Sequence, residues 1–533
     1  MEKKTDRKPQ CLGLLSLLTA SLLPPNQVTN IGYFRNTAKK IRRHFPPEGS
    51  RILKFPQLYR HLWGVCREVS LSLPYLMTSD MNNCASPHAS AAPMRWERLI
   101  TDKRLGMEEY HDPRRHTRSD FQRDYDRLIF SSPFRRLQNK TQVFPLPGSI
   151  FVHNRLTHSL EVSSVGRSMA TEVMMALMKR HAGEEWCDLL LNIPDITATA
   201  CLCHDLGNPP FGHSGEKTIS TFFSEGEGRA LRPLMTPRQW EDTVHFEGNA
   251  NSFRLLTHQF EGRREGGYAM TYSSLAAVVK YPFGSPQANE KGKFGFFESE
   301  EEIFRRVAAD VGMPEISPGR FARHPLVWLV EAADDICYQV MDIEDAHRLK
   351  ILSDDDVHRL LLAFFPPEEQ ARMRQSMGRL NDAHEQVAYL RSYVIGAMVR
   401  ECSRVFTDNE EAILAGTMQG SLTGMIDPRL REAYAGCSAT AHERIYRSPE
   451  VVDIEIAGNR ILTYLLCHMA EAARYPERNF PRLLLEKIPA QYAVRSADFH
   501  TRLQGMLDHI SGMTDVYALN LYRQLNGLTL PAV

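Results

Sequence analysis

The chain has 533 residues, of which 43% are hydrophobic and 24% charged, so it is globular and can bury a sizeable core. Lysine plus arginine and aspartate plus glutamate both number 64, and a net charge of zero predicts no class of partner. Ten cysteines are too few for a dense disulfide framework, which indicates reduced thiols and a cytoplasmic location. No apolar run reaches about 18 residues, which excludes a transmembrane helix and predicts no membrane partner.

Residues 1–93 differ in composition from the remainder of the chain. Basic residues at positions 3, 4, 7 and 8 precede an apolar run at 12–23, a pattern superficially like that of a secretory signal peptide. The segment is otherwise irregular and rich in proline and serine, whereas a helical pattern begins at Met94. We therefore expect residues 1–93 to be an irregular N-terminal extension outside the fold, produced by a start codon assigned upstream of Met94. An export signal and a basic flexible arm are the alternatives.

From Met94 onward the spacing of apolar residues predicts an almost wholly helical protein, with Gly and Pro breakers between the helices. Lys293–Phe297 could form a short strand or hairpin edge, and no alternating strand pattern dominates elsewhere. The predicted fold class is all-α over residues 94–533, with a metal-binding helical core at about 153–346 and a helical C-terminal lobe at about 350–533. The expected helices span 118–128, 155–180, 195–206, 213–224, 248–260, 270–280, 300–312, 325–348, 353–363 and 377–406, with several more between 450 and 525.

Four side chains of the kinds that bind metals lie in apolar helical surroundings. His158 is on the first long helix, His204 and Asp205 are adjacent at the end of a buried helix, and Asp334 is in a helix that is apolar around much of its circumference. A carboxylate in such a helix must be paired or ligating, because burying it alone is costly. A lone histidine is more often a surface or core residue, so the prediction depends on the whole set. Two imidazoles and two carboxylates suit Mn, Fe, Co, Ni or Zn, and Mg less naturally.

Two further features predict chemistry beside such a metal. His213 and Glu216 begin a helix after a Pro-Pro breaker, where the carboxylate can orient the imidazole for acid–base catalysis and the helix N-terminus favours anions. Tyr338 and Asp342 follow Asp334 at i+4 and i+8, so the three share one helix face that could hold a nucleoside sugar. The alternative is that Tyr338 only packs and that Asp342 pairs with an arginine or with solvent.

Cations near these segments could bind a polyphosphate, which needs several of them. The candidates are Arg155, Arg254, Lys280 and Lys293. No P-loop and no Gly-x-Gly-x-x-Gly motif is present, and the Cys-x-Cys-His sequence at 201–204 has no second cysteine pair to complete a structural zinc site.

Six motifs occur in order along the chain. They are Phe134-Arg-Arg-Leu-Gln-Asn-Lys-Thr-Gln-Val-Phe-Pro145, Asn154-Arg-Leu-Thr-His-Ser-Leu-Glu-Val162, Cys203-His-Asp-Leu-Gly-Asn-Pro-Pro-Phe-Gly-His-Ser-Gly-Glu216, Phe246-Glu-Gly-Asn-Ala-Asn-Ser-Phe-Arg254, Ser274-Leu-Ala-Ala-Val-Val-Lys-Tyr-Pro282 and Glu331-Ala-Ala-Asp-Asp-Ile-Cys-Tyr338. With these motifs the sequence from about Met94 to the C-terminus resembles the deoxyguanosine triphosphate triphosphohydrolase (dGTPase) family of HD-domain phosphohydrolases.

The resemblance implies a role for each matching residue. Gln142 would hold the sugar 3′-hydroxyl, Tyr338 would pack on the sugar and exclude a 2′-hydroxyl, and Asn249 would lie at the pocket edge. The metal ligands would be His158, His204, Asp205 and Asp334; catalysis would use His213 and Glu216; and Arg155, Lys280, Lys293 and Asp342 would line the triphosphate or sugar. The metal would be Mg or Mn, with Co, Ni, Fe or Zn as alternatives.

The implied reaction is hydrolysis of dGTP, or of other deoxynucleoside triphosphates, at the α-phosphorus, giving a deoxynucleoside and inorganic triphosphate. The alternatives are another HD phosphohydrolase activity, on an alarmone or a cyclic nucleotide, and a regulator that senses nucleotides or binds single-stranded DNA. The resemblance also implies a homo-oligomer, with a hexamer as one form, and single-stranded DNA or a deoxynucleoside triphosphate as an effector.

Overall fold

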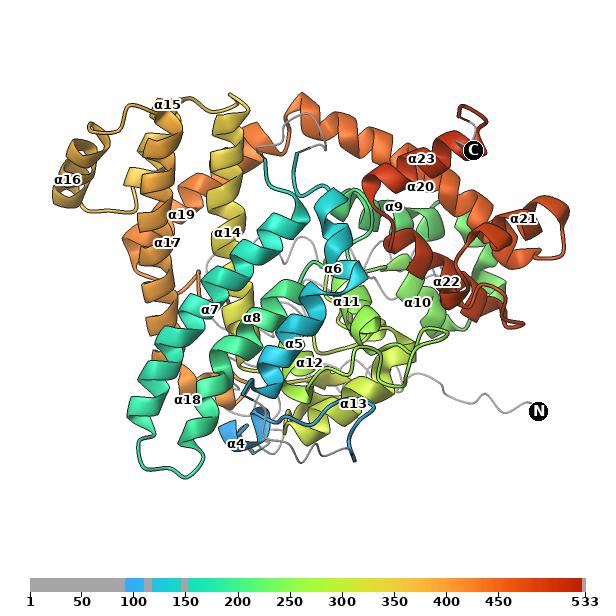
Figure 1. The fold of residues 1–533 in the computed structure, drawn as a ribbon, viewed down its shortest axis with the longest axis horizontal. Coiled ribbons are helices and arrows are strands. Elements are labelled where there is room, and N and C mark those ends of the chain that lie inside the picture. Colours follow the sequence, from blue (N-terminus) through green and yellow to red (C-terminus); the bar gives the residue numbers. More distant parts are fainter. Residues whose placement is uncertain (1–91, 110–116, 145–151, 530–533) are drawn as a thin grey trace, which may run out of the picture. The chain divides into compact units, whose positions relative to one another are not determined.

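The computed structural model describes residues 92–109, 117–144 and 152–529 (Figure 1). The expectation for residues 1–93 therefore falls, apart from its last two residues, outside the described residues. Met94 itself belongs to the fold, because its side chain is buried and its backbone N–H donates a hydrogen bond of 2.8 Å to the carbonyl of Leu414. Among the described residues, no helix combines the length and the hydropathy that crossing a bilayer requires.

Helices make up nearly all of the regular structure in these ranges. The helices before the hairpin are α4 (Trp96–Leu99), α5 (Asp120–Ile129), α6 (Ser132–Arg136), α7 (Arg155–Arg180), α8 (Ile193–Cys203), α9 (Gly212–Ser224), α10 (Pro237–Val244), α11 (Gly248–Thr257), α12 (Tyr272–Val278) and α13 (Glu301–Asp310). An antiparallel hairpin follows, formed by β1 (Glu315–Ser317) and β2 (Arg320–Phe321). The later helices are α14 (Leu326–Arg348), α15 (Asp354–Leu362), α16 (Pro367–Met377), α17 (Ala383–Asp408), α18 (Glu410–Leu414), α19 (Pro428–Thr440), α20 (Pro449–Arg474), α21 (Asn479–Lys487), α22 (Phe499–Ser511) and α23 (Asp515–Leu525).

The centre of the fold is a layer of long helices, in which α7 packs against α8, α14 and α17 (Figure 1). Every residue of α8 from Ile196 to Cys203 is buried, as expected for a helix that is apolar on all sides. α7 begins sharply because Asn154 and Thr157 form a reciprocal capping box. This cap places the first turn of α7, which carries two of the predicted site residues.

The C-terminal helices cover a different part of the fold. α20 packs against α9 and against α21, α22 and α23 (Figure 1). The helix that carries His213, α9, is therefore in contact with a helix from much later in the chain.

The all-α fold class is confirmed, and the predicted bounds of the helix at 155–180 match α7. Two details were wrong. The helix predicted over 377–406 corresponds to α17, which begins only at Ala383, where Asp382 caps it by accepting from the backbone N–H of His384; α16, which precedes it, was not predicted. The strand considered at Lys293–Phe297 is absent, since Phe296 forms only an isolated bridge with Gly284, and the hairpin lies instead at 315–321.

Candidate active site

Three helices bring three potential metal ligands together. His158 lies on the first turn of α7, His204 follows the last residue of α8, and Asp334 lies in α14. One ligand atom from each lies within 4.8 Å of the other two. Nε2 of His158 is 3.2 Å from Oδ1 of Asp334, and Nε2 of His204 is 3.5 Å from the same oxygen. This triad could hold a metal ion.

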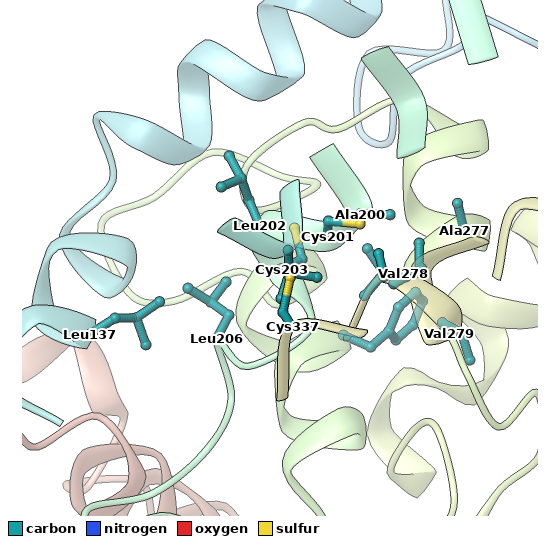
Figure 2. Close-up of a cluster of buried hydrophobic side chains, with 14 of the residues drawn as sticks. Leu137, Ala200, Cys201, Leu202, Cys203, Leu206, Ala277, Val278, Val279 and Cys337 are labelled. Carbon is teal, nitrogen blue, oxygen red and sulfur yellow. The ribbon is translucent and has the colours of Figure 1, made fainter. Parts of the chain in front are cut away.

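An apolar cluster surrounds the end of α8, the helix that His204 follows. Figure 2 shows Cys201 and Cys203 of α8 in one cluster with Cys337 of α14 and with residues 277–279. Gly166 lets α7 approach closely, because a Cβ at that position would lie 2.5 Å from Sγ of Cys201. All seven cysteines in the described ranges have free thiols, which agrees with the prediction of reduced core cysteines.

The hydrogen bonds of His204 fit the requirements of a metal ligand. Its Nδ1 lies 2.7 Å from the carbonyl oxygen of Cys201, so Nδ1 carries the proton and donates it to that oxygen. Its Nε2 is buried and has no hydrogen-bond partner among the described residues. A buried nitrogen without a partner is costly, and a metal ion at the triad would satisfy it.

The charges at the triad are strongly coupled. Burial opposes ionisation of Asp334, but His204 and His158 hold the pKa of its carboxyl at about 2. Burial likewise disfavours the charged imidazole, but Asp205 and Asp334 raise the pKa of His204 to about 9. A metal ion binding here would displace the His204 proton, so metal binding should weaken as the pH falls.

Asp205 lies beside the triad with partners of its own. Its Oδ2 is 3.4 Å from Nε2 of His204 and accepts a hydrogen bond of 2.6 Å from Nη1 of Arg155. Its Oδ1 accepts a hydrogen bond from the side-chain amide of Asn208. The prediction that Asp205 is a fourth ligand stays a prediction, since Arg155 occupies the oxygen that faces the triad.

The predicted acid–base pair forms and extends into a chain of charges. Nδ1 of His213 is 3.0 Å from Oε2 of Glu216, which also lies 3.2 Å from Nζ of Lys293. Lys293 in turn contacts Glu247 at 2.7 Å. The His213 side chain is 72% exposed, and the carboxylate of Glu216 raises the pKa of its imidazole. His213 is therefore accessible, and Glu216 favours its protonated form.

Two cavities meet at these residues, and three side chains line both: Asp205, His213 and Asp334. Each has a volume of about 300 Å³. The first is further lined by Lys280, Lys291 and Lys293, so we call it the lysine cavity. The second is further lined by Gln142, Arg155, Asp335 and Tyr338, so we call it the tyrosine cavity.

Comparisons with known proteins bear on the family of the chain. A family model described as "HD domain" matches residues 155–265, and one described as "Phosphohydrolase-associated domain" matches residues 425–524. The chain is 37% identical to a deoxyguanosinetriphosphate triphosphohydrolase-like protein of Pseudomonas aeruginosa (strain LESB58), over 82% of this chain and 100% of that protein. It is also 37% identical to a protein of the same description from Synechocystis sp. (strain ATCC 27184 / PCC 6803 / Kazusa), with the same coverage.

The chain belongs to the dGTPase-like family of HD-domain phosphohydrolases. The resemblance read from the six motifs is thereby confirmed. A protein named deoxyguanosinetriphosphate triphosphohydrolase from Yersinia enterocolitica serotype O:8 / biotype 1B (strain NCTC 13174 / 8081) is 28% identical, over 76% of this chain and 93% of that relative.

In this dGTPase-like phosphohydrolase, Gln142 and Tyr338, which were predicted to contact a sugar, line the tyrosine cavity, whereas Asp342 lines neither cavity. The side-chain oxygen Oε1 of Gln142 is buried there and has no hydrogen-bond partner among the described residues. The ring of Tyr338 stacks on that of Tyr446, with 5.7 Å between ring centroids. Asp342 is buried behind them and accepts a hydrogen bond of 2.6 Å from the Tyr446 hydroxyl. The alternative partners considered for Asp342, an arginine or solvent, were wrong.

The predicted phosphate-binding residues divide between the two cavities and the core. Lys280 lines the lysine cavity and pairs with Glu331 at 3.2 Å. Asn249 lines it too, as predicted for the pocket edge, and its side-chain amide donates to Glu247. Arg254 is elsewhere: its guanidinium is buried in salt bridges to Asp508 and Glu300, so the idea that it binds phosphate was wrong.

Several residues of the site were missed in the sequence. Glu247 and Glu331 had a signal, because each lies within a motif that carries another site residue, and Lys291 lies two residues before the predicted Lys293. Tyr446 had none, because it lies more than a hundred residues after Asp342, next to a π-helical turn at Ala441–Ile445. Only the tertiary fold brings Tyr446 to α14.

Proposed function

We propose that this protein hydrolyses deoxynucleoside triphosphates, dGTP first among them, at the α-phosphorus, releasing the deoxynucleoside and inorganic triphosphate. One observation carries the proposal: a cationic cavity and a cavity suited to a sugar meet at the metal-ligand triad. A nucleotide that spans both cavities would have its α-phosphate beside the triad. The names of the relatives from Pseudomonas, Synechocystis and Yersinia support the same reaction.

The lysine cavity suits the β- and γ-phosphates. Lys280 and Lys293 pair with the carboxylates of Glu331 and Glu216, and both ammonium groups have a raised pKa, although burial opposes the charge. They are therefore charged at neutral pH. Phosphate oxygens are strong acceptors that would compete with these carboxylates for the lysine N–H groups.

The tyrosine cavity suits a deoxyribose. The partnerless Oε1 of Gln142 can accept a hydrogen bond from a 3′-hydroxyl, which would remove the cost of leaving that oxygen buried and unsatisfied. The Tyr338 ring, held by its stack on Tyr446, offers a flat face to the sugar. A 2′-hydroxyl would press against that ring, which supports selection of a deoxynucleotide over a ribonucleotide.

Different side chains at the two cavities would perform different parts of the reaction. A divalent ion held by His158, His204 and Asp334, with Asp205 as a fourth ligand, would act as a Lewis acid and lower the pKa of a water molecule. The two imidazole nitrogens in this donor set favour Mn, Fe, Co, Ni or Zn over Mg. When the bond between the α-phosphorus and the 5′-oxygen breaks, protonated His213 gives its proton to the 5′-oxygen. Glu216 orients the imidazole and favours its charged form.

Product analysis tests the proposal. The full chain is incubated with Mn²⁺ or Mg²⁺ and each of the four dNTPs or GTP, and nucleosides and phosphates are separated by chromatography. We expect deoxynucleoside and triphosphate in equal amounts, loss of activity in His204→Ala, and a drop of about 10²–10⁴-fold in His213→Ala. His384→Ala, a change of an exposed histidine on α17, is the matched control and should keep full activity. Nucleoside mono- or diphosphate products would refute attack at the α-phosphorus.

The remaining predictions about partners extend this proposal. A panel of guanosine alarmones and cyclic nucleotides separates the proposed reaction from other HD phosphohydrolase activities. Turnover that requires single-stranded DNA or a second dNTP would identify an effector, and binding of either without any turnover would favour the regulator. Light scattering of the purified protein tests the predicted homo-oligomer.

A further inference from the structure

One buried carboxylate of the C-terminal helices joins two segments of the active site. Asp515, the first residue of α23, is buried. Its Oδ2 accepts hydrogen bonds from the backbone N–H of Thr141, at 2.8 Å, and from the Thr141 hydroxyl, at 2.6 Å. Its Oδ1 accepts a third, at 2.9 Å, from the backbone N–H of Phe211. The two oxygens thus serve two segments that are 70 residues apart in the chain.

Each of these segments carries a site residue. Thr141 immediately precedes Gln142, whose side chain lines the tyrosine cavity. Phe211 precedes the first residue of α9 and lies two residues before His213. The hydrogen bonds that Asp515 accepts therefore hold the backbone next to the proposed sugar-binding side chain, Gln142, and close to the proposed acid, His213.

Phe211 needs such support because of its backbone conformation. Its φ of 62° lies in the left-handed region, which a residue with a bulky side chain adopts only when its surroundings hold it there. The Phe211 ring is pressed against Gly458 of α20, where a Cβ would come within 2.7 Å of the ring. Two C-terminal helices thus hold this turn, one through the backbone N–H and one through the ring.

Lys140 forms a second link beside the first. Its side chain is 2% exposed, and Nζ donates hydrogen bonds to the carbonyl oxygens of Asn208, at 2.5 Å, and of Ser511, at 2.8 Å. Asn208 belongs to the turn between Asp205 and α9, and Ser511 is the last residue of α22. The C-terminal helices therefore contact the Lys140–Gln142 segment and the turn before His213 at more than one point.

We propose that Asp515 is a positioning residue that sets His213 and Gln142 relative to each other across the metal-ligand triad. The inference rests on the proposed function, since it concerns the same reaction. It gives the C-terminal helices α20–α23 a part in catalysis: their residues line neither cavity, but they fix the two backbone segments that carry the acid and the 3′-hydroxyl acceptor. A carboxylate suits this task because both of its oxygens accept, whereas an amide has one acceptor and one donor.

The first test replaces Asp515 by asparagine in the full chain. The amide has the same shape but only one acceptor oxygen, so either Thr141 or Phe211 loses its acceptor and faces an N–H₂ group. Asp498→Asn is the matched control: Asp498 caps α22 in the same region, accepting from the backbone N–H of Thr501, and it is exposed. Amide hydrogen exchange at Thr141 and Phe211 reads the bonds directly, without any need for turnover.

The expected result is faster exchange at one or both amides in Asp515→Asn and a fall in kcat of about 10²-fold, as for other small misplacements of catalytic groups. Asp498→Asn should match the wild type in both measurements. If Asp515→Asn only lowers the melting temperature and keeps the wild-type kcat below that temperature, the residue is merely structural and the inference is overturned. If the wild type releases no triphosphate from any dNTP, the proposed function and the inference both fail, and that outcome is distinct from the first.

A second pair of variants tests the Gln142 side alone. Thr141→Val removes the hydroxyl donor to Asp515 but keeps the backbone N–H, and Thr141→Ser restores a hydroxyl. We expect Thr141→Val to narrow the preference for a dNTP over its 2′,3′-dideoxy analogue, and Thr141→Ser to retain it. An unchanged preference in a folded Thr141→Val protein would refute the role of this bond in setting Gln142.

Discussion

Replacing Gly166 by alanine should disturb the contact that brings the metal-ligand histidines together. A Cβ at position 166 would lie 2.5 Å from Sγ of Cys201, so the buried thiol would have to shift or α7 and α8 would have to move apart. Alanine is favoured over glycine within a helix by about 0.5–1 kcal/mol, whereas overpacking a core costs about 1–3 kcal/mol. The overpacking cost is the larger, and we expect a net loss of roughly 1–2 kcal/mol in the free energy of unfolding.

Two companion variants separate the effect of the close contact from the general effect of alanine in a helix. Gly436 also lies within a helix, α19, but has no atom within 4 Å of an added Cβ, so Gly436→Ala should stabilise by about 0.5–1 kcal/mol. Cys201→Ala removes the sulfur that the new methyl group would meet. The loss from Gly166→Ala should therefore shrink in that background, with a coupling energy of about 1–3 kcal/mol in the double-mutant cycle.

Thermal unfolding followed by circular dichroism measures the stabilities, and calorimetric titration with Mn²⁺ measures the metal affinity. Because His158 and His204 are carried by the two helices that move, Gly166→Ala should weaken the metal by about tenfold or more. The reasoning is refuted if Gly166→Ala stabilises the protein as much as Gly436→Ala does. It is equally refuted if the loss is the same with and without Cys201.

Three further predictions concern pH and metal. Replacing Glu216 by glutamine should lower the pKa of His213, because the carboxylate that raises it is lost. The rate falls at high pH as His213 loses its proton, so this fall should occur at lower pH in the variant's rate–pH profile. A fall at the same pH as in the wild type would contradict the role of His213 as an acid. Asp345 and Glu161 raise the pKa of His153 to about 10 although burial opposes it, so its stabilisation is full below the unfolded pKa of about 6.5 and is lost as the pH rises through about 10. His153→Gln should therefore lower the melting temperature at pH 6 and change it little above pH 10, and an equal drop at both would contradict the assignment. Removal of metal with a chelator should lower the melting temperature, and Mn²⁺ should restore it; no change would argue against the triad as a metal site.

Much of the fold was readable in the sequence because it depends on local patterns. The long helix α7 is bounded at its start by the Asn154–Thr157 capping box, and its bounds were predicted correctly. The burial of α8 and α14 followed from their apolar composition. α16 was missed because it buries only Met373 and Met377, too few apolar residues to give a clear helical period, and the start of α17 was placed too early because periodicity does not locate the Asp382 cap.

The candidate site was readable only as far as its residues lie in short motifs. His158, His204 and Asp334 meet as expected, since each is fixed by its own helix and the three helices pack together. Tyr446 and Asp515 could not be predicted, because each lies more than 100 positions along the chain from its partner at the site, which is Asp342 for Tyr446 and Thr141 for Asp515. Only the tertiary fold brings these pairs together. Arg254 shows the opposite error: a cation within a motif is as readily part of a buried salt bridge as of a binding site.

The cleft also shows how a site for a highly charged substrate can be stable before the substrate arrives. Three cations that line it each contact a carboxylate: Lys293 contacts Glu216 and Glu247, Lys280 contacts Glu331, and Arg155 contacts Asp205. Clustered cations without such partners would repel one another and destabilise the fold. A triphosphate would replace these carboxylates as the acceptor, so binding exchanges one set of ion pairs for another. The affinity for a triphosphate should therefore depend more on how well its phosphates compete with these carboxylates than on the number of cations.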